Sequence, residues 1–163
     1  KFSSYNLTTV EWLLTFGDSS CFFYVGDIIA DSSNNIYVGG ALSGTCNFGA
    51  TQVTSSSLNA FILKMNSSRQ VVEVNTYGES SSNNWIDDLS IDSNGNIAAV
   101  GRSYGASTNW GGNTLSLNDG SYDLIVAKFN NSGYHLWSTA VGGTGNENSG
   151  EISVDASGNF IVV

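Results

Sequence analysis

The sequence of 163 residues contains no proline, a single histidine, two cysteines and only five basic residues. Because fourteen acidic residues oppose those five, the formal net charge is -9. This charge disfavours nucleic acid as a partner, since phosphates require stripes of Lys and Arg. No apolar run approaches the roughly 20 residues of a membrane-spanning helix. No initiator Met, signal peptide or tag is present, so we read the chain as a piece of a mature or longer protein.

Charged residues are also scarce, at 12% of the chain, and Ser, Asn, Thr and Gly supply the polarity instead. Hydrophobic residues make up 40%. That share excludes a disordered tail, and the length is enough for one domain with its own core.

Residues that usually carry chemistry are few. His135, the only histidine, is placed in a predicted strand and offers neither a catalytic triad nor a metal cluster. The turn sequence DSNGN from Asp92 matches a calcium loop only in part, because the glycine position and the distant Glu ligand are missing. Asp87 and Asp88 are adjacent, which points them to opposite faces of a regular strand and disfavours a glycosidase-like pair. We therefore predict a protein that is not an enzyme and has no cofactor and no metal site.

The two cysteines, Cys21 and Cys46, are 25 positions apart, without C-x-x-C spacing and without a nearby histidine. This arrangement disfavours zinc. We expect a disulfide that staples two loops of one repeat, and a pair of free, partly buried thiols is the alternative. A disulfide would indicate maturation in an oxidising compartment.

One phrase occurs three times: DSSNNIYVG from Asp31, DSNGNIAAVG from Asp92 and DASGNFIVV from Asp155, at separations of 61 and 63 positions. Agreement among several landmarks indicates a structural repeat of about 62 residues. Similar spacing separates Gly17, Gly78 and Gly142, then Asn47 and Asn109, and also Lys1, Lys64 and Lys128. We divide the chain into a first unit of residues 1–63, a second of residues 64–127 and a partial third of residues 128–163.

Each unit is expected to hold four short strands. The repeated phrase is interpreted as a hairpin turn, because Asp and Asn bond to their own backbone and tolerate positive φ, which Gly95 and Gly158 adopt freely. A longer loop with the motif NFG or NWG is expected before the third strand. No sustained helical periodicity is present, so the predicted fold class is all-β. Strands are expected at residues 27–30, 35–39, 61–65, 70–77, 96–101, 134–141 and 159–163.

Several expected strands are continuous apolar runs, such as FILKM from Phe61 and FIVV from Phe160. A strand with one wet face alternates, whereas a strand covered on both faces need not. Four-stranded antiparallel sheets stacked face to face satisfy this pattern, as radial β-propeller blades or as a linear stack. Because propellers have roughly 4 to 8 blades, about two and a half units would form an incomplete ring with open edges. Head-to-tail contacts that do not close would generate a filament.

The units resemble the bacterial-type β-propeller repeats called SBBP, whose consensus runs IAVDSSGNIYVTG…NFGG…DAFVAKLNSSGNLLWSTYLGG. Its counterparts here are IIADSSNNIYVGG from Ile28, EISVDASGNFIVV from Glu151 and YDLIVAKFNNSGYHLWSTAVGG from Tyr122. The resemblance covers essentially the whole chain and departs in the first unit, where the loop SSYNLTTVEW is two residues longer. It implies propeller blades and an extracellular setting. It implies no activity, because the family shares no catalytic residues.

Three N-x-[ST] triplets begin at Asn6, Asn66 and Asn130, and the last two share one register on the turn after the third strand. We treat all three as candidate N-glycosylation sites of a secreted protein. The alternative is that Asn simply suits this turn.

Lys64 and Lys128 share one register inside apolar strands, where a positive charge needs a partner. We expect one structural ion pair per unit. The candidate partners are Asp88 with its counterparts Asp27 and Glu151, or else the turn aspartates.

The tryptophans divide into two groups. Trp12 and Trp137 match each other in the repeat, and Trp110 matches Phe48, so we expect these three in the core. Trp85 is interpreted as a loop residue without a counterpart, where an exposed indole would stack on a sugar ring. Ordinary loop packing is the alternative for Trp85.

The first functional hypothesis is a non-enzymatic extracellular structural or adhesive repeat protein. It would be glycosylated and would assemble with further copies of itself, or with further repeats of the same chain, into a surface fibre or layer. The second is a carbohydrate-binding, lectin-like propeller module whose partners are glycans. The third is a non-catalytic part of a larger secreted enzyme. All three place the protein outside the cell or on its surface.

Overall fold

A computed structural model describes residues 13–17, 19–118, 120–148, 150–155 and 157–163. In these ranges every regular element is a β-strand, and none is a helix long and apolar enough to cross a membrane. The strands are β1 (Cys21–Ala30), β2 (Ile36–Phe48), β3 (Thr51–Met65), β4 (Val71–Tyr77), β5 (Asn83–Ile91), β6 (Ile97–Tyr104), β7 (Ser107–Thr108), β8 (Leu115–Ser116), β9 (Tyr122–Phe129), β10 (His135–Val141), β11 (Ile152–Val154) and β12 (Phe160–Val162).

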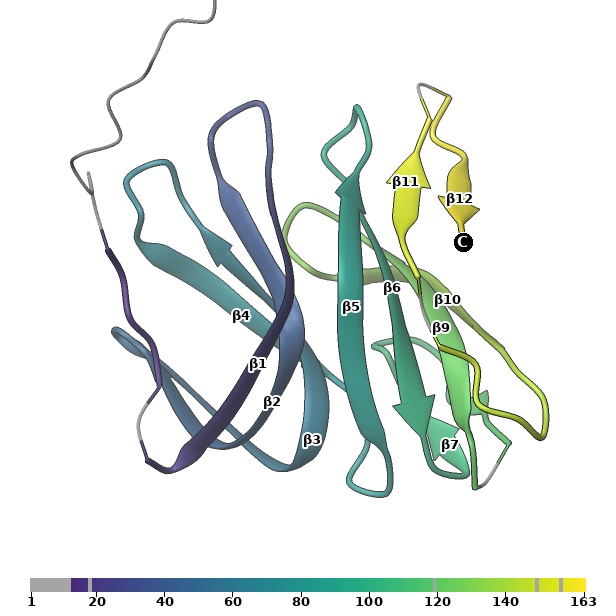
Figure 1. The fold of residues 1–163 in the computed structure, drawn as a ribbon. Helices are drawn as coiled ribbons and strands as arrows, with labels where there is room; N and C mark the ends of the chain where they lie inside the picture. Colours follow the sequence, from purple (N-terminus) through teal and green to yellow (C-terminus); the bar gives the residue numbers. More distant parts are fainter. Residues whose placement is uncertain (1–12, 18, 119, 149, 156) are drawn as a thin grey trace, which may run out of the picture.

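The strands form two antiparallel sheets of four strands each, which confirms the all-β prediction (Figure 1). The first sheet has the order β1-β2-β3-β4, and the second has the order β10-β9-β6-β5. A third repeat begins with the two-stranded hairpin β11–β12, and the short pair β7–β8 lies in the connection between β6 and β9. The sheets span residues 21–77 and 83–141, so each combines parts of two units as we divided the sequence.

The pairing expected in the first repeat is present, since Ile36 lies opposite Met65 and Gly40 lies opposite Phe61 in one sheet. The expected strand lengths were wrong, because β2 and β3 pair along nearly their whole length. The motif NFG therefore lies at the tip of a long hairpin, and only its counterpart NWG in the second repeat lies in a loop.

The repeated phrase is the hairpin turn that was predicted, and the same hydrogen bonds recur in all three copies. In the first, the Oδ1 atom of Asp31 accepts the backbone N–H groups of Ser33 and Asn35, at 2.8 and 2.9 Å. Asp92 and Asp155 accept the corresponding pairs of N–H groups. The positive φ that closes each turn is supplied by Asn34, Gly95 and Gly158.

A disulfide joins Cys21 to Cys46, which confirms the expected pairing. The expectation that it staples two loops was wrong, because Cys21 begins β1 and Cys46 lies near the end of β2. The bridge therefore holds the outer ends of two adjacent strands together, and the buried Cys46 contributes to the apolar cluster of the first sheet.

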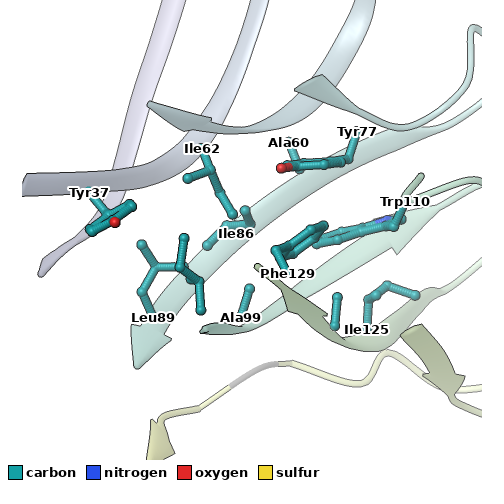
Figure 2. Packing of buried hydrophobic residues seen from close by; sticks show 12 residues of the cluster. Tyr37, Ala60, Ile62, Tyr77, Ile86, Leu89, Ala99, Trp110, Ile125 and Phe129 are labelled. Atoms are coloured by element: carbon teal, nitrogen blue, oxygen red, sulfur yellow. The ribbon is translucent and has the colours of Figure 1, made fainter. Parts of the chain in front are cut away.

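The main core lies between the two sheets, which pack face to face. Figure 2 shows Ile62 of β3 beside Ile86 of β5, and Tyr77 of β4 lying over Trp110 and Phe129. The rings of Tyr77 and Phe129 are 4.4 Å apart between centroids, and those of Tyr77 and Trp110 are stacked at 6.2 Å. Such burial of apolar surface on both faces of a strand is what the continuous apolar runs predicted.

Of the three tryptophans expected in the core, Trp110 is confirmed and Trp137 was wrong. Trp110 and Phe48 are fully buried. Trp137 is 40% exposed on β10, where its ring packs against Phe160 at 5.5 Å. Trp12 lies outside the described residues.

Candidate functional site: an open apolar groove on the first sheet

The contacts between successive repeats use the same strand positions each time. In the second sheet, Leu89, Ile91, Ile97 and Ala99 pack toward the first sheet. Their counterparts 63 positions later, Ile152, Val154, Phe160 and Val162, belong to the hairpin β11–β12 and pack toward the second sheet.

The opposite faces of the same strands receive these side chains. Ala98 and Val100 of β6 are fully buried beneath Ile152 of the hairpin. Their counterparts 61 positions earlier in β2 are Tyr37 and Gly39, which face the second sheet. Each repeat thus has one face that packs on the preceding repeat and one face that receives the next.

A carboxylate strengthens each of these contacts in the same way. The Oδ2 atom of Asp27 accepts the N–H of Leu89 at 3.2 Å, and the Oδ2 atom of Asp88 accepts the N–H of Ile152 at 2.6 Å. Burial, together with Asp27 beside it, raises the pKa of Asp88 against the opposing effect of the N–H groups of Ile152 and Leu89. Asp88 is therefore placed as an acceptor for the next repeat and forms no ion pair with either expected lysine.

The lysines of the repeat have different partners. Lys128 forms an ion pair with the turn aspartate Asp92 at 2.9 Å, which is the second of the two partner sets considered from the sequence. Burial alone would raise the pKa of Asp92, but hydrogen bonds from Asn96, Lys128 and the backbone lower it to about 2. Lys64 instead donates to the carbonyl oxygen of Asn131 at 2.7 Å, across the contact between the sheets.

The turn between β9 and β10 docks on the first sheet through its backbone carbonyl groups. Besides the bond from Lys64, the hydroxyl of Tyr77 donates to the carbonyl oxygen of Gly133 at 2.6 Å. The side-chain amide of Asn75 donates to the carbonyl oxygen of Ser132 at 3.0 Å. Burial raises the pKa of the Tyr77 hydroxyl, so this group remains a neutral donor.

The first sheet has the same apolar positions on its outer face, and no other strand of the described residues packs on them. Ile28, Ala30, Ile36 and Val38 are the counterparts of the four residues that join the second sheet to the first. Together with Phe23, Leu63 and Met65 they line a groove of about 550 Å³. Ile28 is 59% exposed at its rim.

Leu14 and Phe16 lie at the edge of this groove. The N–H of Gly17 donates to the carbonyl oxygen of Asn47 at 3.4 Å, as the N–H of Gly78 donates to that of Asn109 at 2.8 Å. Phe16 packs on Phe48 at 5.6 Å, as Tyr77 packs on Trp110. The segment before β1 therefore lies against the first sheet as the end of β4 lies against the second.

The hairpin β11–β12 lies on the far side of the second sheet from the first sheet (Figure 1). Its outward face is apolar. Ile161, the counterpart of Ala98, is 55% exposed there, and Val163, the counterpart of Val100, is also exposed. Glu151, the counterpart of Asp27 and Asp88, is exposed on the same face. The described residues thus present two apolar faces of opposite type.

Trp85 was wrongly assigned to a loop, since it lies in β5 opposite Arg102 of β6. Its half-buried ring meets the edge of Tyr122 at 5.7 Å, and the guanidinium carbon of Arg102 lies 5.5 Å from its centroid. Arg102 is itself held by Asp87 at 3.5 Å. Together with the exposed Tyr104, these residues form an aromatic patch beyond the part of the second sheet that the hairpin covers.

The two candidate glycosylation sites within the described residues are the first residues of equivalent turns. The Oδ1 atom of Asn66 accepts the N–H groups of Ser68 and Gln70, and that of Asn130 accepts those of Ser132 and Tyr134. These bonds account for Asn at both positions, and they leave glycosylation a prediction. Asn6 lies outside the described residues.

His135 packs against Phe129, and its Nε2 atom lies 2.9 Å from the hydroxyl of Ser138. Partial burial lowers the pKa of the His135 imidazole. Within the described ranges, no three side chains of His, Cys, Asp or Glu come together as metal ligands would.

No family model matches this sequence, and a search of curated proteins found none similar to it. The resemblance to the SBBP repeats therefore depends on the quoted motifs.

The groove itself was missed in the sequence, although the signal was present. Ile28, Ile36 and Val38 occupy the register of Leu89, Ile97 and Ala99, which are buried in the second repeat. Comparing these positions in the sequence would have identified the same apolar face on the first repeat.

Proposed function

We propose that the protein is a non-enzymatic extracellular repeat protein with a structural or adhesive role, whose four-stranded sheets continue a stack of like sheets. The observation that carries this proposal is the recurrence of one contact surface. The same four apolar positions and the same carboxylate join the first sheet to the second and the second sheet to the hairpin. Because the same contact surface recurs from repeat to repeat, it supports the stacking of further sheets into an extended assembly.

Several features support the extracellular part of the proposal. The disulfide between Cys21 and Cys46 fits an oxidising compartment. The surface is rich in hydroxyl and amide groups, and sequons lie on equivalent turns at Asn66 and Asn130. The stack is propeller-like if successive sheets turn around a common axis, as the SBBP resemblance implies, and linear otherwise.

The test is to locate the protein in its source. Immunogold electron microscopy with antibodies against the purified chain should label fibres or a layer on the cell surface. Mass spectrometry of the same material should find glycan on peptides containing Asn6, Asn66 or Asn130. Label confined to the cell interior, on protein without a disulfide, would contradict the proposal.

A second candidate, a lectin-like module, is favoured by the aromatic patch around Trp85. Aromatic rings on an exposed sheet face offer stacking surfaces for sugar rings, and Arg102 adds hydrogen-bond donors. A glycan array with the purified chain tests this directly. Binding that is lost in Trp85→Ala and Tyr104→Ala, but kept in Tyr134→Ala at another exposed tyrosine, would favour the lectin; an empty array would exclude it for the glycans sampled.

A further inference from the structure

We propose that the groove on the first sheet is the binding site for the outward face of the hairpin β11–β12 of a second copy of this chain. This inference rests on the proposed function and adds the partner and the register of the contact. The two faces are different surfaces at opposite ends of the molecule, so each copy has one of each (Figure 1).

The register of the contact follows from the two contacts already formed. Ala98 meets Ile152 where the second sheet receives the hairpin, and Tyr37 shares a cluster with Leu89 where the first sheet receives the second. Ile161 occupies the repeat position of Tyr37 and Ala98, the residues that receive the next repeat. Ile28 occupies the repeat position of Leu89 and Ile152, the residues that pack on the preceding repeat. In the proposed contact, Ile161 of one copy therefore packs against Ile28 of the next.

The polar groups of the two faces correspond as well. Glu151 is placed where Asp27 and Asp88 accept an N–H from the following repeat, and the N–H of Ile28 is the matching donor in the second copy.

The proposed contact is heterologous, because the surface that inserts differs from the surface that receives. Heterologous contacts add copies head to tail and generate filaments wherever the rotation does not close. Both faces lose exposed apolar surface in the contact, which is the main driving force for such association. Stacking of identical copies would thus extend the repeat beyond one chain.

The experiment is sedimentation velocity over a range of concentrations with two single variants of the full chain. Ile28→Asp places a charge at the rim of the groove, and Ile161→Asp places one on the hairpin. Both side chains are more than half exposed, so the fold should tolerate either change, which circular dichroism checks. Val72→Asp, at a β4 residue that is 53% exposed and lies outside the groove, is the matched control.

We expect the native chain and Val72→Asp to form a series of oligomers that grows with concentration. Each single variant should associate roughly tenfold to a hundredfold more weakly, because an aspartate would be buried without a partner. An equal mixture of the two variants should form dimers, because the intact hairpin of Ile28→Asp can bind the intact groove of Ile161→Asp. The dimers should not grow further, because both faces that remain free carry the aspartate.

Three outcomes would overturn the proposal. A native chain that stays monomeric at all concentrations would show that the groove accepts only something other than a second copy. Loss of association in Ile28→Asp but not in Ile161→Asp would indicate groove-to-groove pairing instead. Equal loss in Val72→Asp would indicate non-specific association. None of these results shows whether the protein lies on the cell surface. The immunogold experiment therefore tests the proposed function separately.

Discussion

Gly39 offers a direct test of how closely the two sheets pack. A methyl group at this position of β2 would lie 2.8 Å from Cγ2 of Ile86 and 2.9 Å from Cδ1 of Leu89. Both neighbours are buried, so neither can move away without displacing other side chains. The φ of Gly39 lies outside the left-handed region, so Gly39→Ala adds volume without adding backbone strain.

The expected cost of Gly39→Ala follows from overpacking in a rigid core, which typically amounts to about 1 to 3 kcal/mol. For a chain of this size, a loss of about 2 kcal/mol lowers the melting temperature by roughly 4 to 8 °C. Urea unfolding and thermal unfolding, both followed by circular dichroism, measure the two quantities. Gly143→Ala is the control, because the nearest side-chain atom, Oε1 of Glu147, lies 3.9 Å from the added methyl group.

A double variant separates overpacking from other effects of the substitution. Ile86→Ala alone should cost about 2 to 5 kcal/mol through the cavity that it leaves. In Gly39→Ala/Ile86→Ala the new methyl group occupies part of that cavity, so the double variant should cost less than the sum by roughly 0.5 to 3 kcal/mol. Unchanged stability in Gly39→Ala, or strict additivity in the double variant, would refute the close packing of the sheets.

Three further expectations concern stability. Replacing Cys21 and Cys46 with alanine should lower the free energy of unfolding in urea by about 3 kcal/mol, given the 25-residue separation. The pKa of Asp92 lies below its unfolded value of 3.8, so its contribution is complete above pH 4 and is lost as the pH falls toward 2. Asp92→Asn should therefore be less stable by about 1 to 2 kcal/mol at pH 7 in urea unfolding, and the difference should vanish near pH 2. At Asp88, whose pKa is raised, asparagine should match or exceed the native stability at pH 7, because it keeps an acceptor for Ile152 without the charge. Alanine at this position should cost about 1 to 3 kcal/mol.

Each expectation has a clear contradicting result. Equal free energies of unfolding for the oxidised chain and the alanine variant would show that the disulfide does not stabilise the fold. An Asp92→Asn deficit that persists at pH 2 would mean that the loss is steric and not electrostatic. If asparagine and alanine at position 88 behave alike, the bond to Ile152 contributes nothing to the contact.

The turns and the strand pairing were predictable because they depend on local chemistry. The Asp31 turn needs only an aspartate, a residue that accepts positive φ and the backbone between them, and all of these are adjacent in sequence. The run of apolar residues from Phe61 correctly indicated a strand covered on both faces, since Phe61, Ile62 and Leu63 are all buried.

What could not be predicted depends on the neighbours that a side chain meets in space. Trp137 occupies a regular position of the repeat. Its ring packs on Phe160 of the next repeat, but the side chain remains 40% exposed. Lys128 forms an ion pair with Asp92 because the β5–β6 turn and the end of β9 lie at the same end of the second sheet. Lys64 instead donates to the backbone of Asn131. Trp85 was misplaced because an Asn-rich segment, which typically forms a turn, here begins β5.

Covalent trapping tests the stacking of copies most directly. In the double variant Ile28→Cys/Ile161→Cys, the native cysteines are already paired, so the two new thiols are the only ones available. Because they lie at opposite ends of one molecule, mild oxidation should give a ladder of disulfide-linked dimers, trimers and larger species on a non-reducing gel. A chain that remains monomeric under oxidation, with both thiols free, would contradict head-to-tail stacking through the groove.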